Sequence, residues 1–281
     1  MAIYLETNAL RKLTSYSCEE YAYTSIFSIF ELLSGITEEN FEIRKACLLR
    51  IKKQKLEIRG PMIDKLFGKL VGKEEYNSFA YKMIRDIYTA TLKARKYSFF
   101  NDLRLLINKN ENLHALTWLR SWDNKIQTIT NNLSSIFEDE DRIYIKRIYE
   151  KSGVTALAEH FWNKYYTNRI DEERLSHAAA FLAPGAEEEL RQETDALFSK
   201  YNYKLFMVSQ AVVFSKAFFI NGNTQNKNNA SDLLHLLYLD KNTKFVSNDK
   251  IYQTILEACP YFKLAVLNNE KNLSDLNKIT C

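Results

Sequence analysis

Short apolar runs alternate with helical patterns at the N-terminal end of the chain. Residues 2–5 are apolar and are followed by a polar Glu-Thr-Asn, which predicts a buried strand and then a helix or turn. Thr24 and Ser25 offer N-cap chemistry to a helix over residues 26–35, which is apolar on nearly every face and stops at Gly35. Residues 39–54 indicate a basic amphipathic helix, and residues 56–58 favour another strand.

The C-terminal end repeats this alternation. Residues 221–229 form a polar, turn-forming loop, and a Leu-rich helix is expected over 233–238. The pattern then predicts a strand at 244–247, a helix at 250–257 and a final strand at 262–267. Strands that alternate with helices favour a parallel sheet, whose ligands sit at the carboxyl ends of the strands.

The middle of the chain has a different pattern. From about residue 62 to residue 215, apolar residues recur at spacings of three and four, and no strand alternation is sustained. The Pro184-Gly185 pair breaks this region, and Gly153 is a candidate helix end. We therefore predict an α/β core made of residues 1–60 and 221–281, with an all-α insertion over residues 61–220.

The composition is that of a globular protein. Of 281 residues, 46% are hydrophobic and 26% charged, with only 7 Gly and 3 Pro, which excludes a collagen-like or disordered chain. The four cysteines include no CxxC pair, so the sequence offers neither a zinc ribbon nor a disulfide framework, and reduced thiols are expected. No stretch approaches the roughly eighteen apolar residues of a membrane span, and no signal-peptide pattern opens the chain. We expect a soluble, cytoplasmic protein that does not bind a membrane.

The net charge of +4 is small but unevenly distributed. Residues 41–59 hold seven basic side chains against two acidic ones, a local charge of +5: Arg44, Lys45, Arg50, Lys52, Lys53, Lys55 and Arg59. A basic stretch beside a group of carboxylates suits a substrate with a phosphate backbone. The alternative is a solvated helix face.

Four carboxylates stand where the predicted fold places ligands. Glu6 and Asp249 each follow a short apolar strand, and Glu31 lies in the apolar helix. An isolated buried carboxylate costs several kcal/mol unless it is neutralised or paired, and a bound cation is one such partner. A protonated Glu31, or a buried arginine pair, is the alternative. Asp232 and Asp249 also stand at helix starts, where Asp serves as a cap. We expect His235, one turn after Asp232, to pack or to support the site rather than to catalyse.

The order of these elements resembles the PIN-domain family of nucleases. The strand ending in Glu-Thr-Asn resembles the family's opening strand followed by Asp-Thr-Asn, and the helix around Glu31 resembles its second acidic element. The run Asp232-Leu-Leu-His-Leu-Leu-Tyr and then Phe-Val-Ser-Asn-Asp249-Lys looks like its third acid on a helix and a strand ending in Val-Thr-x-Asp. The chain departs from the family in having Glu6 where Asp is usual, and in its long helical middle.

The resemblance implies metal-dependent hydrolysis of phosphodiester bonds. All-oxygen ligands favour Mg²⁺ or Mn²⁺ over zinc, and such an ion activates water and stabilises the charge on the phosphate. The expected metal ligands and catalytic residues are Glu6, Glu31, Asp232 and Asp249. Four adjacent polar residues are candidates for orienting water or phosphate, with local turn hydrogen bonding as an equal alternative: Thr7, Asn8, Ser247 and Asn248.

An endoribonuclease is therefore the expected function, with RNA favoured over DNA as the nucleic-acid partner. A DNA-directed PIN-like nuclease is one alternative. A catalytically degenerate PIN module that acts as an interaction scaffold is another. Many small PIN proteins are toxins, so the resemblance also implies a toxin or defence role, a protein inhibitor or antitoxin as partner, and a homodimer.

Overall fold

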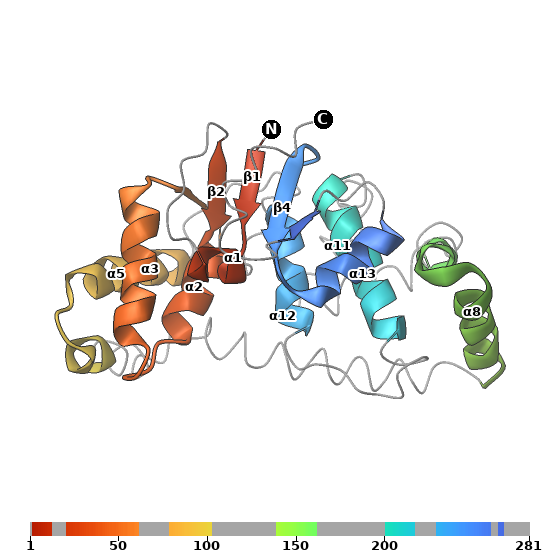
Figure 1. Ribbon diagram of the computed structural model, residues 1–281, viewed down its shortest axis with the longest axis horizontal. Coiled ribbons are helices and arrows are strands. Elements are labelled where there is room, and N and C mark those ends of the chain that lie inside the picture. The colour runs from red at the N-terminus through yellow and green to blue at the C-terminus, as the bar shows by residue number, and fades with distance from the viewer. Residues whose placement is uncertain are drawn as a thin grey trace.

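A five-stranded, all-parallel sheet forms the centre of the fold (Figure 1). The computed structural model describes residues 2–12, 21–61, 79–102, 139–161, 200–216, 229–259 and 264–266. The strands are β1 (Ala2–Leu5), β2 (Ala22–Ser25), β3 (Glu57–Arg59), β4 (Thr243–Ser247) and β5 (Leu264–Val266). They lie in the order β3-β2-β1-β4-β5, and each neighbouring pair is parallel. Helices flank the sheet, which confirms the predicted α/β class with a parallel sheet.

The strand β2 was not predicted, whereas the N-cap chemistry expected at Thr24 and Ser25 is confirmed for Ser25. Both residues lie in β2 and are fully buried. The Thr24 hydroxyl donates to the Leu5 carbonyl, at 2.8 Å. The Ser25 hydroxyl accepts from the Ser28 amide at 3.0 Å and so also caps the following helix. Two of the four residues of β2 are polar, so the sequence shows no apolar run there. These polar residues are tolerated in a buried strand because hydrogen bonds satisfy them.

On the β2–β3 side, the described helices follow the N-terminal predictions. They are α1 (Thr7–Arg11), α2 (Ile26–Ser34), α3 (Phe41–Lys53) and α5 (Phe79–Lys93). Gly35 is the C-cap of α2, as predicted. The helix α5 packs against α2 and α3, so this part of the predicted insertion lies directly on the core (Figure 1).

On the β4–β5 side the described helices are α8 (Asp139–Phe161), α11 (Tyr201–Ser215), α12 (Asn229–Leu234) and α13 (Lys250–Ala258). The helix expected over residues 233–238 begins earlier, at Asn229, and continues as the 3₁₀ helix η3 (His235–Tyr238). Gly153 interrupts α8 with φ 74° and ψ −167°, in agreement with the predicted helix end. The helix α11 packs against α8, α12, η3 and α13.

Within the predicted insertion, the described residues form helices and contain no strand. The Pro184-Gly185 pair and residues 221–228 of the predicted loop lie outside the described residues, so the extent of the insertion stays a prediction. Of the helices that the structure describes, none combines the length and apolar character needed to cross a bilayer.

The order of the strands reverses between β1 and β4. The chain adds β2 and then β3 on one side of β1, whereas β4 and β5 extend the sheet on the other side. In sheets of this kind, ligands bind beyond the carboxyl ends of the strands at this switch point. The carboxyl ends of β1, β2 and β4 lie at the lower edge of the sheet in Figure 1, beside α1, α2 and α12.

Candidate functional site

The candidate site lies where β1 and β4 end side by side. These strands pair in register, with Leu5 opposite Val246, so the residues that follow each strand emerge together at the switch point. Glu6 follows β1 directly, and Asp249 stands two residues after β4. The two carboxylates, 243 positions apart in the chain (249 − 6), therefore belong to one edge of the sheet.

Glu6 is the buried carboxyl of the site, only 2% exposed. Its Oε1 accepts a hydrogen bond of 2.9 Å from the Ser247 hydroxyl, which in turn accepts one of 3.0 Å from the Asp249 amide. Burial raises the pKa of Glu6 to about 7, opposed by the charge of His235 and by hydrogen bonds from the Asn8 backbone and the Ser247 hydroxyl, and aided by the charge of Asp249. A carboxyl of this kind exchanges its proton near neutral pH, or gives it up to a cation.

Asp249 is the N-cap residue of α13, but its side chain makes no capping hydrogen bond. Its Oδ2 instead accepts a short hydrogen bond from the side-chain amide of Asn8, at the start of α1. The Asp249 carboxylate therefore does not cap α13. Asn8 holds this carboxylate against the end of β1.

Glu31 is not the buried carboxyl that its apolar helix predicted. Its side chain is 23% exposed, because it projects from α2 towards the switch point instead of into the core. Its Oε2 accepts a short hydrogen bond from the Thr7 hydroxyl and lies 2.9 Å from His235 Nε2. Among the described residues, the basic partner of the Glu31 carboxylate is therefore a histidine and not an arginine.

His235 connects Glu31 to the core. The ring is 1% exposed, and its Nδ1 lies 2.7 Å from the hydroxyl of Tyr4, the third residue of β1. Burial lowers the pKa of His235, but the negative charges of Glu31, Glu6 and Asp232 outweigh this and the net direction is upward. An imidazolium donates from both nitrogens, so His235 orients Glu31 and offsets part of the negative charge. These contacts are compatible with the supporting role expected for His235, which stays a prediction.

Asp232 is the fourth residue of α12, which begins at Asn229, so it is not the N-cap of that helix. Burial raises the pKa of Asp232 to about 8, and the negative charges of Glu31, Asp249 and Glu6 add to the rise while His235 opposes it. The charges of the other three predicted carboxylates therefore all reach Asp232. The Tyr252 hydroxyl donates to the Asp232 carbonyl at 2.6 Å and ties α12 to α13.

The adjacent polar residues hold the carboxylates in place. Thr7 binds Glu31, Asn8 binds Asp249 and Ser247 binds Glu6. These contacts join different elements of the fold and are not merely local turn hydrogen bonds. Asn248 differs, since its Oδ1 is buried without a hydrogen-bond partner in the described part of the chain.

Comparison with protein-family models, with curated proteins and with solved structures found no match. The resemblance to PIN domains therefore stays a prediction from the residues, and the chemistry of the site rests on its geometry.

The donor set suits a hard cation held partly through water. No three Asp, Glu, His or Cys side chains among the described residues lie close enough together to ligate one ion. Mg²⁺ is usually held by one or two carboxylates, with water and substrate phosphates as its other ligands. Four carboxylates, two of them with a raised pKa, provide such oxygen donors.

Proposed function

We propose that the chain is a PIN-like, metal-dependent nuclease that hydrolyses phosphodiester bonds, with RNA as its substrate. The supporting observation is that four carboxylates gather at the switch point of a parallel sheet, where the charges of the other three help to raise the pKa of Asp232. A folded protein retains such repulsion where the site has a positively charged ligand. The parallel sheet with flanking helices is compatible with a PIN-like core, and the helical middle of the chain is then an insertion in that core.

In this proposal Asp232, Asp249, Glu6 and Glu31 hold Mg²⁺ or Mn²⁺, directly or through water. The ion, when bound, supplies an activated water and stabilises charge on the phosphate. Asp232 and Glu6, whose pKa values are about 8 and 7, are the groups of this site that can take up or release a proton near neutral pH. Thr7 and His235 keep Glu31 oriented, so that it need not reorganise when substrate arrives.

Glu6 supports a second candidate function. It is almost fully buried and bonded to Ser247, and its side chain is one methylene longer than the Asp usual at this position in PIN domains. A site altered in this way suits a degenerate PIN module that binds partners without catalysis. Stabilisation by Mn²⁺ separates the two functions, because a scaffold has no need of the ion.

The proposal is tested by incubating the chain with end-labelled single-stranded RNA and DNA of one sequence, with Mn²⁺, Mg²⁺ or EDTA. We expect RNA to be cleaved only with a divalent ion, and Asp232→Asn to remove the cleavage. Asp86→Asn is the matched control, since Asp86 is exposed on α5. Cleavage that survives Asp232→Asn, or no cleavage of either substrate, refutes the nuclease. Preferential cleavage of DNA would reassign the substrate.

The same variant tests the physiological role. If the chain is a toxin or defence effector, its expression slows growth and Asp232→Asn relieves the effect. An antitoxin or other protein inhibitor would be captured by the inactive variant and would block cleavage by the active one. Light scattering by the purified chain tests the proposed homodimer.

A further inference from the structure

Two arginines lie near the carboxylates, one on α1 and one on α3. Arg11 ends α1, and its Nη1 donates to Asn8 Oδ1 at 3.3 Å, the same Asn8 whose amide holds Asp249. Arg44, the fourth residue of α3, is close enough to Glu31 for that carboxylate to act on the pKa of its guanidinium. The two guanidinium groups thus reach the site next to Asp249 and next to Glu31.

The guanidinium of Arg44 is partly buried, and one of its nitrogens has no hydrogen-bond partner among the described residues. Its guanidinium lies against the end of α2, where a Cβ at Gly35 would come within 3.0 Å of Nη2. Its Nη1 is buried and has no hydrogen-bond partner in the part of the chain that the structure describes. Glu31, the nearest carboxylate to act on it, is already engaged with Thr7 and His235. A buried charged donor without an acceptor is unfavourable, so this N–H points to a missing anionic partner.

Arg11 and Arg44 also lie close to each other. Burial lowers the pKa of Arg44, and the positive charge of Arg11 lowers it further. Both charges act on the buried thiol of Cys47, which lies one turn after Arg44 and donates to the Leu10 carbonyl at 2.9 Å. Two like charges that share a small volume are stabilised by an anion between them, and a guanidinium matches phosphate oxygens in geometry.

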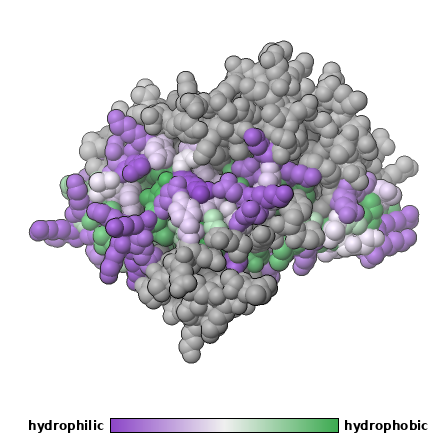
Figure 2. Space-filling model, turned by 90° about the horizontal axis from the view of Figure 1, so that it is seen from above, coloured by the Kyte–Doolittle hydropathy of each residue, from purple (hydrophilic) through white to green (hydrophobic). Residues whose placement is uncertain are grey.

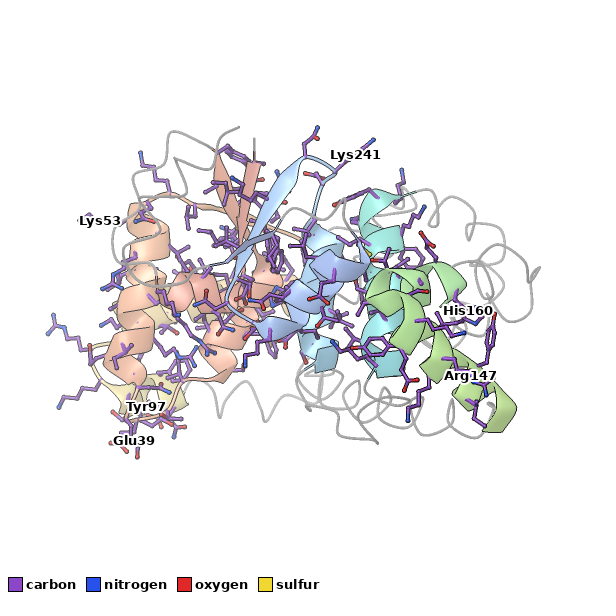
Figure 3. All side chains as sticks on the ribbon, turned by 45° about the vertical axis from the view of Figure 1, so that its right-hand side comes forward. Glu39, Lys53, Tyr97, Arg147, His160 and Lys241 are labelled. Carbon is purple, nitrogen blue, oxygen red and sulfur yellow. The ribbon has the colours of Figure 1, made fainter. Side chains whose placement is uncertain are left out.

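The rest of the basic stretch has other roles. Arg59 lies 3.6 Å over the ring of Tyr23 and forms an ion pair with Asp240 at 2.8 Å. Lys53 is exposed and is the last residue of α3 (Figure 3), nine positions after Arg44 (53 − 44). Hydrophilic side chains cover the end of the molecule where α3 and α5 lie (Figure 2). Most of the basic stretch is therefore a solvated or paired surface, and Arg44 is the member that reaches the carboxylates.

We infer that Arg11 and Arg44 form a binding site for a phosphate group of a single-stranded RNA backbone, beside the carboxylates. The identity of this anion rests on the proposed nuclease function. The two guanidiniums would hold a phosphate near Glu31 and Asp249 and so place the neighbouring phosphodiester at the metal ligands. The selectivity for RNA or DNA does not come from this pair, because both carry the same phosphate.

The test measures binding rather than cleavage. A fluorescein-labelled single-stranded RNA is titrated with the chain in EDTA over a series of salt concentrations, and binding is followed by anisotropy. Arg44→Gln should weaken binding about tenfold and lower the salt dependence, the slope of log K against log salt, by about 0.7. Lys53→Gln removes the same charge from the same helix and should leave both quantities unchanged.

Arg11→Gln should act in the same direction, and the double variant should lose less than the two single losses combined, because both groups hold one phosphate. If Arg44→Gln does not fold, the same binding measurements are made on Arg44→Lys and on Arg11→Gln, since Arg11 is exposed. Equal effects of Arg44→Gln and Lys53→Gln, or no RNA binding by the wild-type chain, overturn the inference.

This outcome is separable from that of the proposed function. Binding that depends on Arg44 without any metal-dependent cleavage refutes the nuclease but keeps the phosphate site. Cleavage that depends on Asp232, together with RNA binding that does not depend on Arg44, keeps the nuclease but refutes the phosphate site.

Discussion

Asp232→Asn is the substitution whose effect the structure predicts in most detail. The pKa of Asp232 rises from an ordinary 3.8 to about 8 in the folded chain. Between these values the folded protein keeps a proton that the unfolded chain has released, so the free energy of unfolding falls as pH rises. The slope is about 1.4 kcal/mol per pH unit for one group.

The magnitude at neutral pH follows directly. From pH 3.8 to pH 7 the loss from Asp232 alone is at most about 4 kcal/mol. Glu6, whose pKa rises from 4.5 to about 7, adds to the loss over a narrower range. The two contributions are not additive, because each charge raises the pKa of the other. A loss of this size is a large part of the roughly 5–15 kcal/mol that stabilises a folded protein.

Asparagine carries no charge at either pH, so Asp232→Asn should be more stable than wild type in EDTA by roughly 2–4 kcal/mol at pH 7. Near pH 4 the two chains should be nearly equal. Urea unfolding followed by circular dichroism between pH 4 and pH 8 measures both, with Asp86→Asn as control. Parallel pH profiles for wild type and Asp232→Asn would show that this carboxyl is not buried among other charges.

Addition of Mn²⁺ provides the complementary measurement. A divalent ion competes with the protons of Asp232 and Glu6, so its stabilisation of the wild-type chain should grow from pH 5 to pH 8. Asp232→Asn should lose most of it. Equal stabilisation of both chains at every pH would exclude Asp232 as a ligand.

Three further substitutions test the supporting contacts. His235→Gln removes the charged partner of Glu31 and should lower the Mn²⁺ affinity, measured by calorimetry, about tenfold or more; an unchanged affinity would exclude this role. Ser25→Ala removes the N-cap of α2 and should cost about 1 kcal/mol in urea unfolding; no loss would mean that water replaces the cap. Arg59→Lys keeps the charge but loses the planar group over Tyr23, and a loss of about 1 kcal/mol is expected. A fully stable lysine variant would assign the contact to charge alone.

The sequence by itself determined the local elements and the positions of the acids. The strands predicted at 2–5 and 244–247 became β1 and β4, whose central apolar residues suit parallel strands buried on both faces. Gly35 ended α2 as expected, since a helix end depends on neighbouring residues. Glu6 and Asp249 follow β1 and β4 in the chain, so their places near the ends of these strands could be predicted from the sequence.

The tertiary structure decided how these acids are used. The apolar surroundings of Glu31 in the sequence predicted burial, yet in the folded chain its carboxylate is 23% exposed and lies 2.9 Å from a buried histidine 204 positions away (235 − 31). Because β1 and β4 are neighbours, Asn8 lies close enough to Asp249 to donate a hydrogen bond to its carboxylate, which therefore does not cap α13. The sequence pattern indicates which faces of a helix are apolar, but not what a polar side chain among them faces. The order of the strands decides that, and with it the convergence of the four carboxylates.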